Sequence, residues 1–459
     1  MATQAIQKKN PLTDGPLGRG ILLFSIPLVL SNLLQVLFNM SDVAVVGRFA
    51  GSDALGAVGS TTTLVTLFTG FLIGAGSGVN IVTARFLGAR EDEEVRTTVH
   101  TSAILCLLIG LALLAIGELT ARPVLTLLGT KPALMDGAVL YLRIYFLGMP
   151  AMALYNFGNG VLSAAGDTRR PLYILAVGGA VNIALNLFTV IVCGLGVAGV
   201  AIASAASQCL SAGLILCTLA RSRESYALHR ESLRIEPRKA RLILSLSLPA
   251  GLQNAIFAIA NLFIQAGVNS FDATMVAGNA AAANADSLVY DVMAAFYTAC
   301  ASFMSQNYGA GKRSRVLRSY LVALGYSFGI GLALGLGLVF AGPAFLALFT
   351  TEAAVVQAGM MRLRVMGFSY AVSAFMDCTI AASRGLGESL APTVIVILGS
   401  CVFRVLWVYT VFAHFHTILA LYLVYVCSWS ITALAEILFF VRAYRRHMGD
   451  MAKLPTAAG

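Results

Sequence analysis

The chain has 459 residues, of which 58% are hydrophobic and only 11% are charged, and its mean hydropathy is +0.83. Soluble proteins carry about 25% charged residues, so the composition excludes a soluble globular protein and predicts an all-α polytopic membrane protein. The net charge of +10 does not indicate nucleic-acid binding, because the basic residues are spread over short loops between apolar segments.

The first apolar segment, Ile21 to Val46, suggests a function. It is long enough to cross a bilayer, which takes about 20 residues, yet it contains Pro27 and Asp42. Three amide side chains precede Asp42 on the same face of the helix. An ionisable residue at the centre of a membrane helix costs about 2.5–3.5 kcal/mol, so it normally faces a bundle interior or a cavity. Asp42 could instead cap the end of the helix, but a functional role is favoured because acids buried in membrane helices are usually functional. Because Pro27 permits a bend, this segment predicts a transporter.

Twelve apolar runs are long enough to span a membrane. Their expected limits are 20–46, 54–84, 99–119, 138–164, 172–193, 196–220, 243–268, 276–305, 319–341, 358–383, 392–413 and 417–441. An even number of spans puts both termini on one side, and most of the 31 Lys and Arg residues lie in the termini or in the loops on that side. Since positive residues accumulate in cytoplasmic loops, we expect a multi-pass cell (inner) membrane protein with both termini cytoplasmic.

The two halves of the chain repeat each other. SIPLVLSN (25–32) matches SLPAGLQN (247–254), and GDTRRP (166–171) matches GESLAP (387–392) at nearly the same offset. Each half has six spans, so the copies share one orientation, and we expect two pseudo-symmetric six-helix lobes around a central cavity. The expected domains are an N-terminal tail, an N-lobe, a basic linker, a C-lobe and a C-terminal tail, at 1–19, 20–220, 221–242, 243–441 and 442–459.

These features resemble the MATE (multidrug and toxin extrusion) family of transporters, over roughly residues 15–446. Besides Pro27 and Asp42, the matching motifs are GAR and GAGKR after the second and eighth spans, GDTRRP and RGLGES after the fourth and tenth, and NIALN (182–186) followed by GLGVAG (194–199). The resemblance implies a secondary active multidrug efflux antiporter, a monomer in membrane lipid that exports organic cations in exchange for H⁺ or Na⁺ and needs no cofactor. A flippase for lipid-linked substrates is the alternative within the same superfamily, although such proteins usually have more helices and a strongly basic cavity.

The resemblance also implies roles for individual residues. Asp42 would bind the coupling ion and Pro27 would be the point at which the helix bends. Polar neighbours would line the same site in the N-lobe: Gln35, Asn182, Asn186 and Ser204. Other members often have an acid where this chain has Asn186, so either a proton or Na⁺ could use the remaining carboxylate, amide and hydroxyl oxygens. Asparagines also join membrane helices structurally, and that interpretation stays open for Asn182 and Asn186.

Five residues of the second half have competing interpretations. Asp377, Asp286 and Asn254 are candidates for lining a C-lobe cavity, where the acids would pair either with substrate cations or with a nearby Arg. Arg404, inside the eleventh span, is predicted to pair with a buried acid rather than to contact substrate. Glu436, near the end of the last span, is expected to reach the membrane interface.

No enzyme or nucleotide-driven pump is indicated. GAGKRS (309–314) resembles a phosphate-binding loop, but Gln306 occupies the position where that motif requires its first glycine. The eight cysteines lie in apolar stretches without paired spacing, and HFH (414–416) is too small to predict a metal site. We therefore predict no catalytic residue, no nucleic-acid partner and no metal site other than possible Na⁺ binding at Asp42.

Overall fold

A computed structural model describes residues 12–453, and over that range helices are the only regular secondary structure. The helices of the first half are α1 (Leu17–Val45), α2 (Ser52–Ala89), α3 (Asp92–Leu127), α4 (Pro132–Leu147), α5 (Met149–Ala164), α6 (Arg169–Leu187) and α7 (Gly196–Ala220). Those of the second half are α8 (Pro237–Val268), α9 (Ala273–Gly309), α10 (Arg313–Leu346), α11 (Ala353–Gly385), α12 (Leu390–Val396), α13 (Phe403–Trp407), α14 (Ala413–Phe415) and α15 (Ile418–Lys453).

These helices form twelve candidate membrane spans in the described part of the chain. Eleven are single helical stretches that are long and apolar enough to cross a membrane, and the twelfth is the pair α4 and α5, which is bent by 46°. The bend falls at Gly148, two residues before Pro150. Proline has no backbone N–H and its ring displaces the carbonyl one turn earlier, which explains why the fourth span is not one straight helix.

Short π-helical segments interrupt three of the spans. Val46–Ala50 continues α1, Phe188–Val192 continues α6, and Ile397–Val402 and Val408–Phe412 flank α13 on both sides. Each π-helical turn inserts an extra residue into the helix and shifts the side chains that follow it. Such turns occur frequently at functional sites, so all three spans are candidates for a functional role.

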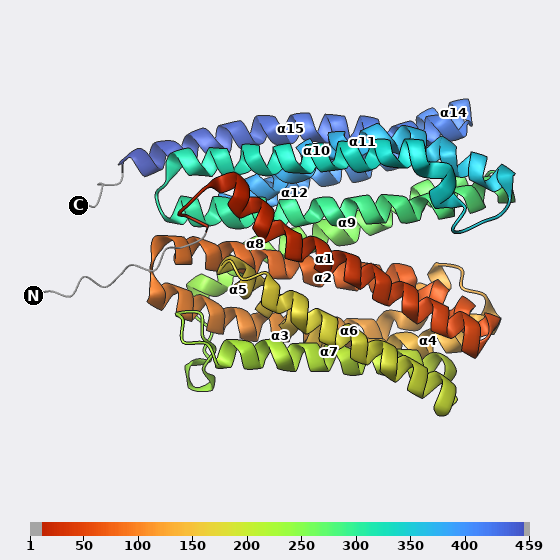
Figure 1. Ribbon diagram of the computed structural model, residues 1–459, viewed down its shortest axis with the longest axis horizontal. Helices are drawn as coiled ribbons and strands as arrows, with labels where there is room; N and C mark the ends of the chain where they lie inside the picture. The colour runs from red at the N-terminus through yellow and green to blue at the C-terminus, as the bar shows by residue number, and fades with distance from the viewer. Residues whose placement is uncertain (1–11, 454–459) are drawn as a thin grey trace, which may run out of the picture.

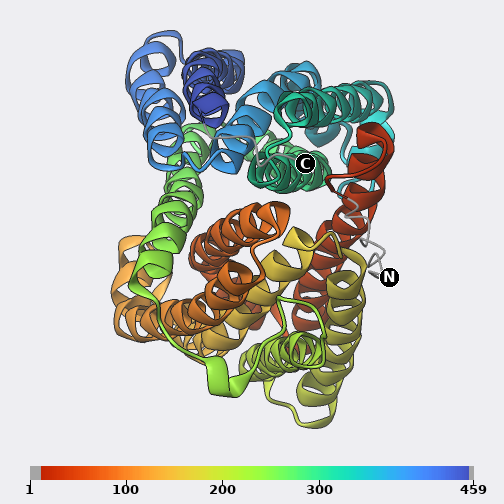
Figure 2. The same cartoon turned by 90° about the vertical axis from the view of Figure 1, so that its left-hand side faces the viewer.

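The two halves of the chain form two bundles that are joined by crossing helices. Helices α2–α7 gather on one side of the molecule and α9–α15 on the other, whereas α1 and α8 run between them at opposite edges (Figures 1 and 2). Accordingly, α1 contacts α6 of the first half and α9 of the second, and α8 contacts α2 along much of its length.

The bundles touch closely at the end of the molecule where α1 begins and α15 ends, which we call the terminal end (Figure 1). A Cβ atom added to Gly88 would lie 2.0 Å from the Gln306 carbonyl oxygen, and one added to Gly309 would lie 1.9 Å from that of Arg85. Nearby, Ser302 Oγ donates a hydrogen bond of 2.9 Å to Asn80 Oδ1. Since only glycine permits such an approach of α2 and α9, this end of the interface is closed.

Residues 12–15, just before α1, are bound to the α9–α10 connection of the second half. Asn307 Nδ2 donates to the Leu12 carbonyl oxygen at 3.1 Å, and Lys312 Nζ to that of Thr13 at 3.0 Å. Arg315 Nη1 donates to the carbonyl oxygen of Gly15 at 2.9 Å. The start of α1 is thereby attached to the opposite half of the chain.

Candidate functional site

The structure brings four of the predicted residues of the first half together around one carboxylate. Asn186 Nδ2 donates to Asp42 Oδ1 at 2.5 Å, and Ser204 Oγ donates to Asp42 Oδ2 at 3.4 Å. Asn182 joins the group, because its Oδ1 accepts a hydrogen bond of 3.2 Å from Asn186 Nδ2. Asp42 is half-buried, and the other three side chains are buried. The cluster therefore links α1, α6 and α7.

One oxygen of this cluster lacks a hydrogen-bond donor. Asn186 Oδ1 is buried and has no hydrogen-bond partner among residues 12–453. A buried acceptor without a donor is costly unless a ligand satisfies it. The cluster also lies beside two of the π-helical segments, because Val46–Ala50 begins four residues after Asp42 and Phe188–Val192 two residues after Asn186.

The two other predicted residues of α1 lie outside this hydrogen-bonded group. Gln35 is exposed, two helical turns before Asp42, and Pro27 is buried within α1. The helix continues through Pro27 without interruption, and the Pro27 carbonyl oxygen accepts a hydrogen bond of 2.9 Å from Ser31 Oγ. Proline therefore weakens the helix at this position but does not break it in this conformation.

A second polar region surrounds a cavity of about 470 Å³ that is lined mainly by the second half. Helices α8, α9, α11, α13 and α15 supply most of its wall, and Thr66 and Gly70 of α2 supply the remainder. Among the predicted residues, Asn254, Asp286 and Asp377 all line it. Asn254 also connects the halves, since its Nδ2 donates to the Gly70 carbonyl oxygen at 2.9 Å.

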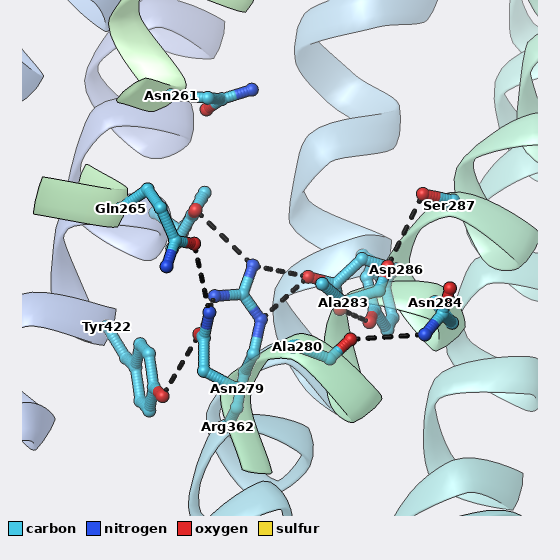
Figure 3. Close-up of polar contacts among 12 residues, drawn as sticks. Asn261, Gln265, Asn279, Ala280, Ala283, Asn284, Asp286, Ser287, Arg362 and Tyr422 are labelled. Carbon is cyan, nitrogen blue, oxygen red and sulfur yellow. Dashed lines mark hydrogen bonds and ion pairs between the residues drawn. The ribbon is translucent and has the colours of Figure 1, made fainter. Parts of the chain in front are cut away.

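An ion pair between Asp286 and Arg362 forms one wall of this cavity (Figure 3). Arg362 donates to Asp286 Oδ2 through Nε at 2.8 Å and through Nη2 at 2.5 Å, and to Asn279 Oδ1 through Nη1 at 2.7 Å. Tyr370 donates its hydroxyl hydrogen to Asp286 Oδ1. Both carboxylate oxygens are thus satisfied, which assigns Asp286 to a pair with arginine, one of its two predicted roles.

Arg404 also lines the cavity, but its surroundings differ from those predicted. Nη1 donates to Asn261 Oδ1 at 2.9 Å and Nε to Ser428 Oγ at 3.4 Å. No carboxylate in the described chain lies within 4.0 Å of its guanidinium group. The prediction that Arg404 pairs directly with a buried acid is therefore wrong. Aromatic rings surround the group instead: those of Phe257, Tyr425 and Trp429, with centroids 4.9–5.8 Å from Cζ.

Two further acids lie deep in the second half. Asp377 is 8% exposed, and its Oδ2 has no hydrogen-bond partner among the residues described. Glu436 is 0% exposed and neither of its carboxyl oxygens has such a partner, so the expectation that it reaches the interface is wrong. Both acids lie in electrostatic range of Arg384, whose Nη2 donates to Gln253 Oε1 at 2.8 Å.

Sequence reasoning missed the central role of Arg362 and its acceptor Asn279. The available signal was the same that singled out Arg404, namely a cation within an apolar span, which requires buried partners. Arg362 stands near the start of the expected tenth span, two residues before Arg364, where a long side chain can reach the membrane interface.

Comparison with known proteins places these sites in a family. The family model described as MatE matches the chain twice, over residues 27–188 and 249–410. The two matched segments are spaced like the predicted repeats, and together they cover more than half of the chain.

Individual relatives agree with that match. The chain is 29% identical over 387 residues to the probable multidrug resistance protein YoeA of Bacillus subtilis, covering 82% of this chain and 83% of the relative. It is 25% identical over 359 residues to a protein of Shewanella oneidensis named FAD transporter, covering 77% and 78%. A solved structure described as MATE in the bent conformation has a TM-score of 0.89 at 23% identity, with 97% of this chain and 100% of that chain covered. The chain is thus a multi-pass membrane protein that belongs to the MatE family, a family of transporters and not of enzymes.

Proposed function

We propose that the protein is a secondary active multidrug exporter whose transport is driven by H⁺ or Na⁺ binding at Asp42. The observation that carries this proposal is the buried oxygen cluster around one carboxylate at the junction of α1, α6 and α7. A proton requires only the Asp42 carboxylate. Na⁺ would in addition find the unpartnered Asn186 Oδ1 and the Asn182 and Ser204 oxygens, which are ligands of the type that hard cations prefer.

The driving force is sufficient for export. One positive charge that moves inward through 100 mV supplies about 2.3 kcal/mol, which sustains a gradient of roughly 50-fold for a substrate without net charge. When one ion is exchanged for one monovalent cation, the potential cancels, and each tenfold concentration gradient of the ion supplies about 1.4 kcal/mol. The ion acts only through its different affinities for the two states of the transporter. In the proposed cycle, residues 20–220 and 243–441 rock as two lobes of one membrane-embedded monomer, and α1 bends at Pro27 when the ion binds.

We propose that the terminal end is cytoplasmic, because α1 begins there, α15 ends there and the basic connections between helices lie there (Figure 1), and positive residues favour the cytoplasmic side. The tight contacts of Gly88 and Gly309 then close the cytoplasmic side. The cavity lies beyond them, toward the opposite end of α8 and α9. In this assignment the structure corresponds to an outward-facing state, from which substrate leaves the cell.

Organic cations are the substrate class that the family resemblance implies, and Asp377 is the cavity group best placed to hold them. Its Oδ2 is buried and has no donor among the described residues, and the residue lines a cavity of a size suited to a drug-like molecule. The relatives include one named multidrug resistance protein and one named FAD transporter, so cargo of either charge is compatible with this fold.

Reconstituted vesicles with an imposed H⁺ or Na⁺ gradient provide the test. Replacing Asp42 by asparagine is expected to abolish gradient-driven efflux of an organic dye while membrane insertion and thermal stability are retained. Asp53→Asn removes an exposed acid near the same end of the bundle and serves as the matched control. Full gradient-driven efflux by the Asp42→Asn variant would refute the coupling role. A flippase would instead move a lipid-linked probe between leaflets without exporting the dye.

A further inference from the structure

Arg404 is a buried cation that faces the second-half cavity without a carboxylate in contact. We propose that it binds an acidic group of the transported molecule, so that the cavity favours aromatic amphiphiles that carry a carboxylate or phosphate, whether or not they also carry a cationic group. This inference rests on the proposed transport function and adds a substrate class to it.

The charges that line the cavity are unequally compensated. Arg362 and Asp286 neutralise each other in direct contact, and the carboxylate is satisfied further by Tyr370. Arg404 and Asp377 are the other charged groups of the lining, and they form no ion pair within 4.0 Å. The first pair is a closed structural unit, whereas the second presents separate charges of opposite sign to the cavity.

The protein offsets the cost of burying Arg404 without a carboxylate of the described chain in contact with it. Its side chain is only 2% exposed, and the penalty for burying one ion is several kcal/mol. The two hydrogen bonds that it makes go to the neutral oxygens of Asn261 and Ser428. The three surrounding aromatic rings each contribute about 2 kcal/mol or more to a desolvated cation, and Asp377 lies in electrostatic range. An intramembrane charge kept under these conditions is best explained by a ligand that uses it.

Shape and local backbone agree with a binding role. Arg404 lies on α13, a single helical turn that is flanked on both sides by the π-helical segments Ile397–Val402 and Val408–Phe412. A guanidinium group matches the two oxygens of a carboxylate or phosphate, with parallel N–H donors. The cavity of about 470 Å³ leaves room beside it for the apolar part of one ligand, which would contact Met366, Met376 and Ile264.

Rhodamine 19 and rhodamine 6G provide a matched pair of probes, because they differ only in that the carboxylic acid of the first is an ethyl ester in the second. We would measure equilibrium binding of each to the purified full chain by fluorescence anisotropy in detergent, without an ion gradient. The wild type is expected to bind the acid at least about tenfold more tightly than the ester. Arg404→Gln is expected to weaken binding of the acid about tenfold or more, as expected for a lost hydrogen bond to a charged group, and to change ester binding less than threefold.

Two further variants support the test. Arg404→Lys keeps the charge but loses the planar fork, so part of the preference for the acid should remain. Asp377→Asn removes the group proposed to hold the cationic part that both probes share, so it should weaken binding of both alike and leave the preference for the acid intact; loss of that preference in Asp377→Asn would contradict Arg404 as its source. If Arg404→Gln does not fold, the Arg404→Lys variant and the wild-type preference decide the question.

Equal affinity of the wild type for both probes would overturn the inference, as would an unchanged preference in Arg404→Gln. Because binding is measured without a gradient, a protein that prefers the acid but shows no gradient-driven efflux would refute the transport proposal alone. Gradient-driven efflux without any preference for the acid would refute the present inference alone.

Discussion

The side chains around Asp42 hold its carboxylate with amide and hydroxyl groups and no second acid. A carboxylate with such partners can accept hydrogen bonds in its ionised form and can also bind a cation. Asn186 is the central partner, since its Nδ2 contacts both Asp42 and Asn182. Asn186 Oδ1 is, among the four residues of the cluster, the only acceptor that is buried without a hydrogen-bond partner in the described chain.

Replacing Asn186 by alanine should therefore change the affinity for the two candidate ions in opposite directions. Na⁺ loses the Asn186 Oδ1 ligand and should bind more weakly, whereas a proton should bind more tightly, because the Nδ2 hydrogen bond stabilises only the ionised Asp42 carboxylate. A hydrogen bond to a charged group is worth about 1.5–3 kcal/mol, or roughly 10- to 150-fold in affinity. The half-maximal H⁺ or Na⁺ concentration for vesicle efflux is the quantity to measure. Gln35→Ala alters an exposed amide of α1 outside the hydrogen-bonded group and should leave that concentration nearly unchanged. Equal effects of both substitutions would contradict a specific role for Asn186.

Single residues also show how far the sequence could be interpreted. Asp42, Asn182, Asn186 and Ser204 were placed correctly as neighbours because the family resemblance fixes which spans meet. The partners of Arg404 and the burial of Glu436 could not be predicted in this way. One sequence shows that a charge lies in an apolar span, but the rotation of that span about its axis depends on packing against several other helices.

At the scale of elements, apolar runs predicted the number of spans well and their internal breaks poorly. Helix α3 extends from Asp92 to Leu127, beyond the expected 99–119, because helices continue past the apolar membrane core into polar surroundings. The π-helical segments leave no clear mark in composition. The Gly88 and Gly309 contacts occupy corresponding positions of the two repeats, in the matching GAR and GAGKR motifs.

Gly309→Leu tests the importance of the close approach of α2 and α9. A Cβ atom at this position would lie 1.9 Å from the Arg85 carbonyl oxygen, so α2 and α9 must separate at the terminal end. We expect faster hydrogen–deuterium exchange in the last two turns of α2 and a lower efflux rate. A Cβ atom added to Gly329, on α10, would meet no atom within 4 Å, so Gly329→Leu is the matched control. Unchanged exchange in the Gly309→Leu variant would show that the contact does not close the interface.

At the scale of the whole molecule, the cavity lies away from the end at which the two halves touch. Alternating access requires that these contacts separate in the other state. The Ser302 and Asn80 side chains meet directly across this interface, one from each half of the chain, with 2.9 Å between Oγ and Oδ1. A bond between these positions should therefore hold the molecule in the state described here.

A disulfide between Asn80→Cys and Ser302→Cys should stop transport when it forms. The variant requires a background in which the eight native cysteines are replaced. Oxidation is expected to abolish gradient-driven efflux, and a reducing agent should restore it. The two single-cysteine variants control for damage by the oxidant. If the oxidised double variant is shown to be cross-linked and still exports at the full rate, rocking about this interface is wrong.

Helix α1 is attached to a different half of the chain at each of its ends. Residues 12–15 are held by Asn307, Lys312 and Arg315 of the second half, whereas Asp42 is held by Asn186 of the first. A relative tilt of the halves must put this helix under tension, and Pro27 is the point of least resistance along it. It follows that α1 couples the charge state of the Asp42 carboxylate at one end to the separation of the two halves of the chain at the other.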